Sequence, residues 1–182
     1  PFFLDPSKMG SIRLYYDHGL HYVHIAIIMD LVGHDVPIPN LEDLLFITGM
    51  ESDPGLQTMI RGVEPENGLR TVPTLNAYLG IDLSDHHIFR VNGHPYLLLT
   101  CGRWEHYHEA TDTPDKLNYQ KMGYIRDYVL KLIDRTSTRS LGRPSKEPAP
   151  EYDTLQTELY FLKKNIQPTL IAFGQDINLN SR

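Results

Sequence analysis

Three short apolar runs along the chain predict buried strands. The first run, at 22–33, is rich in β-branched residues and closes on Gly33. The second, at 44–49, also ends in glycine, and the third, at 95–101, begins with a proline. Apolar runs of this length without alternating polar positions are typical of strands that are buried on both faces of a sheet.

Apolar residues at helical spacing predict helices between and after these strands. Asp53 and Pro54 provide an N-cap and a first-turn proline for a helix that begins there. The longest helix is expected at 114–135, an amphipathic segment of about five turns. Either Asp112 or Thr113 is expected to cap its first turn.

The remaining segments complete the expected organisation. A short helix is expected at 6–17, where Ser7 is an N-cap candidate. We expect residues 1–135 to form the main domain and residues 136–150 to be a linker, because that stretch is rich in proline and polar residues and has no periodicity. Residues 151–182 are expected to be an appended helix and tail.

Strands that alternate with helices predict an α/β fold. We expect a three-layer sandwich in which helices cover a largely parallel or mixed central sheet. No internal repeat or low-complexity tract alters this expectation.

Length, charge and cysteine content exclude several kinds of partner and structure. The chain has 182 residues, 41% of them hydrophobic, which is enough for one domain with a real core. A formal net charge of -6 without a dense basic run argues against nucleic acid or an anionic membrane surface as a partner. No stretch reaches the roughly 18–20 apolar residues of a membrane helix, and a single cysteine, Cys101, excludes an intrachain disulfide.

Asp30 is the first candidate for chemistry, because it interrupts an apolar strand near its carboxyl end. A buried carboxylate costs several kcal/mol unless it is paired or bound to a metal. The site therefore favours a cation. The alternative is a carboxylate that caps the next loop or pairs with an arginine.

Two further segments carry histidine in predicted loops, where binding groups are common. Asp85 and His86 precede a short apolar stretch, and this motif is equally compatible with a helix N-cap. His108 lies between the third strand and the long helix, so that it is free to be a metal ligand.

These segments, in this order, resemble the carboxyl-terminal half of the co-catalytic zinc aminopeptidase family. The family signatures are an Asn-Leu-Asp-Met-type strand end, a Ser-Asp-His motif, and a Tyr-His-Thr followed by Asp-Thr. Here the corresponding segments are IMDLVG at 28–33, SDH at 84–86, and YHE at 107–109 followed by Asp112 and Thr113. GHP at 93–95 is similar to the family's Gly-Ile-Pro turn. The resemblance spans roughly residues 1–135.

The resemblance implies a hydrolase that removes N-terminal residues from peptides with the help of two zinc ions. Asp30 would be a ligand of one zinc and His108 a ligand of the other. The hydroxyl of Tyr107 would donate to the oxyanion of the tetrahedral intermediate. Asp85 and His86 would orient ligands or substrate from outside the metal coordination sphere.

The family's other signatures do not occur in this sequence. They are a His-x-Asp motif, whose Asp bridges the two metals, and a Glu-Glu pair that supplies the general base and another ligand. We therefore expect a domain that is incomplete at its N-terminal side. It is expected to be inactive alone and to need a missing N-terminal segment or another chain.

Two alternatives remain open. A glutaminyl cyclase-like enzyme has the same fold with one zinc and an Asp-Leu-Val-Gly strand end, which residues 30–33 match. Against it, that enzyme tends to have Trp before the ligand His and Asp-Asp-His in place of Ser-Asp-His, whereas Tyr107 and Ser84 follow the peptidase. The other alternative is a non-catalytic interaction domain of the same fold.

Overall fold

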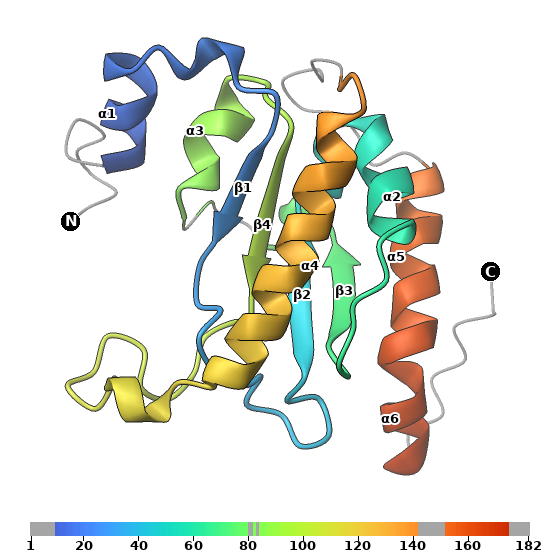
Figure 1. The fold of residues 1–182 in the computed structure, drawn as a ribbon. Coiled ribbons are helices and arrows are strands. Elements are labelled where there is room, and N and C mark those ends of the chain that lie inside the picture. The colour runs from blue at the N-terminus through green and yellow to red at the C-terminus, as the bar shows by residue number, and fades with distance from the viewer. Residues whose placement is uncertain (1–9, 80–81, 83, 142–151, 175–182) are drawn as a thin grey trace.

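Four strands form one mixed sheet in the computed structural model, in the order β1-β4-β2-β3 (Figure 1). The structure describes residues 10–79, 82, 84–141 and 152–174. The strands are β1 (Ala26–Met29), β2 (Leu44–Thr48), β3 (Arg70–Thr74) and β4 (Tyr96–Thr100). β1 and β4 are parallel, β2 and β3 are parallel, and β2 and β4 are antiparallel. The carboxyl ends of β1 and β4 therefore lie at the end of the sheet where β2 and β3 begin.

Six α-helices accompany the sheet in the described residues. They are α1 (Gly10–Asp17), α2 (Pro54–Arg61), α3 (His86–Val91), α4 (Tyr119–Ser137), α5 (Tyr152–Asn165) and α6 (Gln167–Ala172). Asp53 caps α2 as expected, since its side chain accepts a hydrogen bond from the backbone N–H of Gly55 at 2.7 Å. None of the described helices has the length and apolar character needed to cross a membrane.

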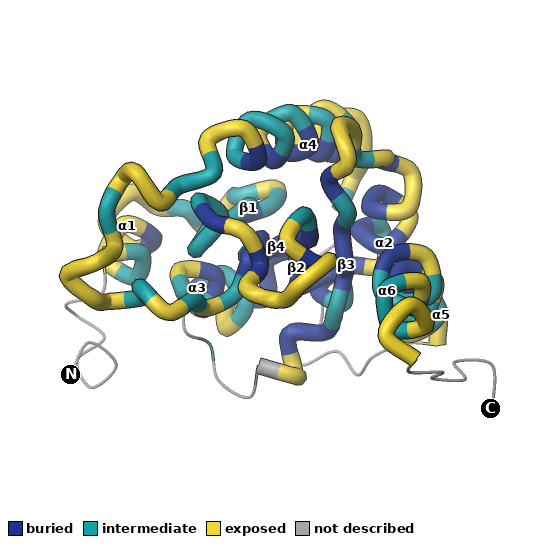
Figure 2. The backbone as a smooth tube through the Cα atoms, turned by 90° about the horizontal axis from the view of Figure 1, so that it is seen from below, coloured by how far each residue is buried: buried dark blue, intermediate teal, exposed yellow. Residues whose placement is uncertain are grey.

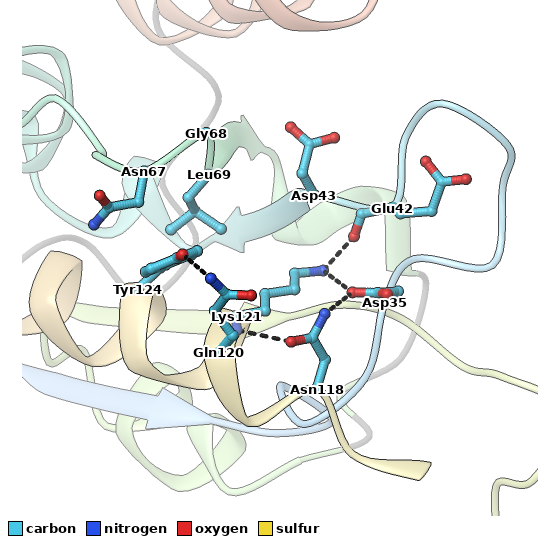
Figure 3. Close-up of a pocket in the computed structure, with 10 residues that line it drawn as sticks. All are labelled: Asp35, Glu42, Asp43, Asn67, Gly68, Leu69, Asn118, Gln120, Lys121 and Tyr124. Carbon is cyan, nitrogen blue, oxygen red and sulfur yellow. Dashed lines mark hydrogen bonds and ion pairs between the residues drawn. The ribbon is translucent and has the colours of Figure 1, made fainter.

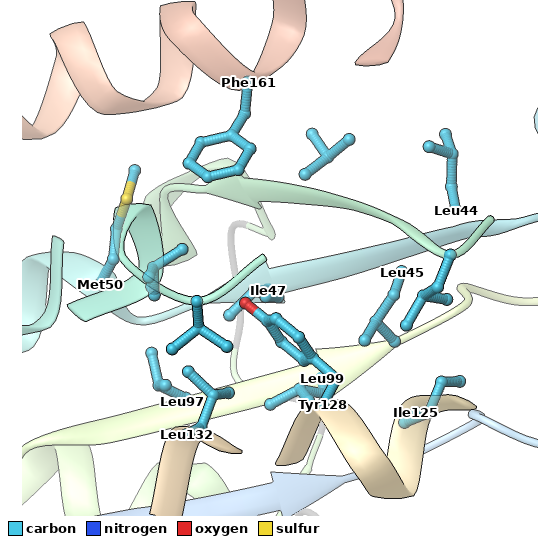
Figure 4. Close-up of a cluster of buried hydrophobic side chains, with 14 of the residues drawn as sticks. Leu44, Leu45, Ile47, Met50, Leu97, Leu99, Ile125, Tyr128, Leu132 and Phe161 are labelled. Atoms are coloured by element: carbon cyan, nitrogen blue, oxygen red, sulfur yellow. The ribbon is translucent and has the colours of Figure 1, made fainter. Parts of the chain in front are cut away.

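Helices lie on both faces of the sheet. Figure 2 shows α4 along one face, with its buried turns directed at the strands and its exposed turns outward, and α3 on the other side. Figure 4 shows Phe161 of α5 on one side of the sheet and Tyr128 and Leu132 of α4 on the other. The α/β class and the mixed sheet expected from the sequence are thus confirmed.

The core lies between these layers. It includes the fully buried Leu45, Ile47, Leu97 and Leu99 of the central strands. Phe161 belongs to the same buried cluster, so α5 packs on the sheet as part of one core.

β1 is shorter and more exposed than predicted. Tyr22 lies in a 3₁₀ helix and is 90% exposed, while Leu31 has a φ of 58°, which ends the extended conformation. Within the described residues β1 is an outer strand, so its apolar side chains are only partly covered and Met29 is 54% exposed. The prediction of a long strand buried on both faces was wrong because an outer strand lacks one neighbour.

The long helix begins later than predicted. Residues Pro114–Lys116 form a 3₁₀ turn, Leu117 is extended, and the N-cap of α4 is Asn118. The side chain of Asn118 accepts a hydrogen bond from the backbone N–H of Lys121 at 2.9 Å. The predicted capping by Asp112 or Thr113 was therefore wrong, while Ser7, the cap candidate of the first helix, lies outside the described residues.

β3, the other outer strand, was not predicted. It contains Pro73, which cannot donate a ladder hydrogen bond and is tolerated on an outer strand. α5 lies against this strand, and the side-chain amide of Asn165 donates to the backbone carbonyl of Thr71 at 2.7 Å. One outer strand of the sheet is thus covered by a helix.

Candidate functional site

The segments that carry Asp30 and His108 lie at the same end of the sheet, where β1 and β4 end. Asp30 follows β1 directly, and its backbone N–H donates to the carbonyl of Leu99 at 3.0 Å. The N–H of Cys101 then donates to the carbonyl of Leu31, also at 3.0 Å. Figure 1 shows the segment after β1 and the loop after β4 at the same end of these parallel strands. Carboxyl ends of parallel strands are where α/β proteins place ligands.

Both segments hold a residue in the left-handed region of backbone space. Apart from two asparagines, the described non-glycine residues with positive φ are Leu31, at 58°, and His108, at 62°. A leucine in this region is uncommon, and such conformations cluster at binding and catalytic sites. No hydrogen bond or ion pair within the described residues involves the side chain of Asp30 or His108.

Tyr107 lies in a stack of side chains in the same loop. Its ring is 3.9 Å from that of His108, with the planes inclined by 20°. The guanidinium of Arg103 lies 5.1 Å from the centre of the Tyr107 ring. The stack restrains the orientation of Tyr107, whose hydroxyl is a hydrogen-bond donor.

His34 connects the Asp30 segment to the His108 loop. Its ring lies flat on the indole of Trp104, with 4.4 Å between centroids and 2° between planes. His34 Nδ1 lies 2.7 Å from the backbone carbonyl oxygen of Asp35. Its Nε2 is buried and has no hydrogen-bond partner. Sequence reasoning missed this residue, although it follows Asp30 by only four positions.

A cavity of about 300 Å³ lies at the same edge of the sheet (Figure 3). The side chain of Lys121 crosses it and donates to the backbone carbonyls of Glu42, at 2.6 Å, and His34, at 3.3 Å. Its Nζ is also 4.0 Å from a carboxylate oxygen of Asp35, which accepts from the amide of Asn118 at 2.9 Å. Lys121 and Asn118 thus bind His34 and Asp35, the segment shortly after Asp30, to the start of α4.

A second polar cluster is centred on Asp82. The carboxylate accepts hydrogen bonds from Arg90 at 2.7 Å, His87 at 2.8 Å, Asn76 at 3.0 Å and His86 at 3.2 Å. Burial raises the pKa of Asp82, but these hydrogen bonds outweigh it and hold the pKa well below its ordinary value. His86 is fully buried, and its Nδ1 has no partner.

Glu51 joins this cluster after the carboxyl end of β2. One carboxylate oxygen accepts from the backbone N–H of Asn76 at 2.7 Å, and the other is buried without a partner. Burial, and more weakly the charge of Glu158, raises the pKa of Glu51. The cluster therefore contains one acid, Glu51, whose pKa is raised, beside another, Asp82, whose pKa is lowered.

Asp85 and His86 belong to the start of α3. Asp85 occupies the N-cap position without a side-chain hydrogen bond to the helix, and it is exposed. His86 stacks on Tyr96, the first residue of β4, at 5.4 Å. No hydrogen bond, ion pair or ring contact between described residues links this pair to Asp30 or His108. The structure thus brings the segments of Asp30, Tyr107 and His108 to one edge, and it places His86 in the Asp82 cluster.

The described residues contain no group of three or more His, Cys, Asp or Glu side chains positioned to hold a metal ion. Comparison with protein-family models, with curated proteins and with solved structures found no match to this chain.

Proposed function

We propose that this chain is part of a zinc-dependent exopeptidase that removes N-terminal residues from peptides. Asp30 would bind one zinc and His108 the other. The observation that carries the proposal is the hydrogen bonding of residues 30–31 to Leu99 and Cys101, which holds the Asp30 segment beside the start of the His108 loop.

The donor types fit zinc. A carboxylate oxygen and an imidazole nitrogen are common zinc ligands, and neither side chain makes a hydrogen bond or ion pair with another described residue. Two donors are fewer than the three or more protein ligands that a zinc site uses, so the proposal requires further donors for each metal. When bound, zinc would polarise the peptide carbonyl and lower the pKa of a bound water.

Tyr107 is assigned the role of a hydrogen-bond donor to the peptide carbonyl oxygen. Its ring is restrained by Arg103 and His108, so its hydroxyl is directed with little loss of side-chain entropy on binding. Asp85 and His86 are not part of this proposal, because His86 stacks on Tyr96 at the start of β4, whereas the His108 loop follows the end of that strand. The three-layer zinc-peptidase architecture, incomplete at its N-terminal side, belongs to the same proposal.

We also infer that the complete unit includes residues that pair with or cover β1. Ile27, Ile28 and Met29 are apolar and only partly buried on this outer strand. Exposed apolar strand edges favour association with another strand. An N-terminal segment or another chain would supply the residues that cover β1.

A non-catalytic interaction domain is the second candidate. The specific observation in its favour is that the described residues bring no three metal-binding side chains together. This candidate predicts neither zinc binding nor turnover.

The test is zinc content by elemental analysis and hydrolysis of aminoacyl 4-nitroanilides by the full-length gene product. We expect bound zinc and turnover, both lost in His108→Ala and reduced in Asp30→Asn. His106→Ala is the matched control, because His106 lies in the same loop with Nδ1 2.9 Å from the hydroxyl of Thr111. Ammonia release from an N-terminal glutamine peptide, without nitroanilide hydrolysis, would instead indicate a cyclase. Wild-type protein without zinc or turnover would overturn the proposal.

A further inference from the structure

A polar groove of about 360 Å³ lies between α2 and α5. Figure 1 shows the two helices side by side and running in the same direction. At one end of the groove Arg61 of α2 lies over the ring of Tyr160 of α5, at 5.8 Å. Pro54 and Asp153, each seven positions earlier, both line the groove and therefore lie toward its other end. We call this feature the α2–α5 groove.

Gln57 lines this groove with a side-chain amide that has no partner. The residue is 7% exposed, and within the described residues its amide makes no hydrogen bond. Buried amides are usually hydrogen-bonded, because leaving them unpaired is costly. An apolar side chain would pack between two helices without this cost. Gln57 is therefore better explained by a ligand in the groove than by packing alone.

Gln156 places a second amide in the groove, from the opposite helix. It too makes no hydrogen bond within the part of the chain that the structure describes. A glutamine amide offers an N–H donor and a carbonyl acceptor, which complement the carbonyl and the N–H of a peptide unit. An extended peptide presents such groups on both of its sides. One amide on each helix therefore fits an extended main chain that lies between them.

The groove carries opposite charges toward its two ends. Asp153 and Arg61 are both exposed, and neither makes an ion pair with another described residue. Seven helical residues rise by about 10 Å, and three extended residues span about the same length. A tripeptide would thus place its ammonium at Asp153 and its carboxylate at Arg61. These full charges exceed the half-charges of the helix ends, which favour the reverse direction.

We propose that the α2–α5 groove is a binding site for a short peptide of about three residues with free termini. Gln57 and Gln156 bind its main chain, while Asp153 binds its ammonium and Arg61 its carboxylate. The groove borders α5, which covers the outer strand β3, whereas the Asp30 segment follows the other outer strand, β1. The proposal therefore concerns a different part of the molecule and does not depend on the proposed function.

The experiment is a calorimetric titration of the full-length gene product with trialanine, in a His108→Ala background so that the proposed peptidase does not consume the peptide. We expect saturable binding with a dissociation constant of about 1 mM or below. Gln57→Met keeps the length of the side chain without its amide and is expected to weaken binding about tenfold. Gln120→Met, at an exposed position of α4, is the matched control and is expected to bind as the parent does.

The two ends of the peptide are tested by changing the peptide itself, which avoids any effect on folding. Amidation of the carboxyl end or acetylation of the amino end of trialanine is expected to weaken binding about threefold. In Arg61→Met the acid and the amide are expected to bind equally. In Asp153→Asn the free and the acetylated peptide are expected to bind equally.

The proposal is overturned if trialanine shows no saturable binding up to about 10 mM, or if Gln57→Met binds as the parent does. It is also overturned if amidation weakens binding as much in Arg61→Met as in the parent, because Arg61 then does not bind the carboxylate. Zinc content and turnover do not enter these outcomes. The peptide site and the proposed function therefore stand or fail independently.

Discussion

The rings of His34 and Trp104 are parallel to within 2° and 4.4 Å apart. They come from two different loops, one after β1 and one after β4. The contact therefore joins the two segments that carry Asp30 and His108. Stacked aromatic pairs of this kind stabilise by about 0.5–1.5 kcal/mol beyond the area that they bury.

Lys121→Met is expected to destabilise the protein by about 2 kcal/mol. The methionine fills a similar volume, but it leaves the backbone carbonyl of His34 without its side-chain donor and that of Glu42 with only the N–H of Val36. Urea unfolding followed by circular dichroism measures the change. Lys116→Met, at an exposed position, is expected to have little effect, and equal losses in both variants would contradict this role of Lys121.

Asp82→Asn is expected to cost about 3 kcal/mol at pH 7, because a buried carboxylate with four donors is removed. The folded pKa of Asp82 lies below its unfolded value, so the ionised form contributes stability above about pH 4, and this contribution is lost as the pH falls through the folded pKa. The difference between variant and wild type should therefore shrink below about pH 4. Unfolding free energies measured from pH 2 to pH 8 test this.

The control for this series is Asp85→Asn, three positions along the chain. Asp85 is exposed and its side chain makes no hydrogen bond to α3. Its replacement is expected to leave stability unchanged at every pH. A pH-independent loss in Asp82→Asn would show that the charge of Asp82 is not what stabilises the cluster.

Glu51→Gln is expected to have the opposite effect on stability, a gain that grows as the pH rises. The folded pKa of Glu51 lies above its unfolded value, so wild-type stability falls as the pH rises through the folded pKa. The glutamine keeps an acceptor for the N–H of Asn76 without a buried charge, and we expect a gain of about 1 kcal/mol at pH 8. The gain should vanish near pH 4, where the carboxyl is neutral in wild type as well. Thermal unfolding at pH 4 and pH 8 measures this gain. Glu109→Gln, at an exposed position, is the control and is expected to show no such gain.

Gly49→Ala is expected to destabilise by more than about 3 kcal/mol. Gly49 has a φ of 95°, and an added Cβ would lie 2.6 Å from the backbone oxygen of Tyr96. Gly68→Ala isolates the backbone effect, because Gly68 has a φ of 82° and nothing within 4 Å of the added atom. That variant is expected to lose only about 1 kcal/mol. Similar losses in the two variants would mean that the contact with Tyr96 is relieved at little cost.

The parts of the fold that were predicted are those with a strong local signal. The run that forms β2 and the Asp53-Pro54 start of α2 were both recognised, because apolar continuity and capping are encoded within a few residues. β3 was missed because Pro73 and two threonines conceal a strand whose place is fixed by β2 and α5. The start of α4 was misplaced because Leu117 packs against Gly33, a contact between distant parts of the chain.

The candidate site, too, could be predicted only where its signal lies within a few residues of the sequence. The edge at which Asp30 and His108 lie was predictable, because strand ends in an α/β fold are sequence-local. His34 was not, since its significance depends on burial, on the Asp35 carbonyl and on a stacking partner 70 positions away. The Asp82 cluster was missed for a similar reason, because Asn76 and Arg90 come from outside the motif that drew notice to His86.

The two outer strands of the sheet differ in a way that limits how copies of the chain can polymerise. α5 covers β3 and occupies the Thr71 carbonyl, whereas β1 has no neighbour on its outer side among the described residues. A molecule with open strands on both sides can extend indefinitely into a fibre. If two copies paired through β1, each would have used its only open outer strand among the described residues, so such pairing would stop at two copies and would not extend into a fibre.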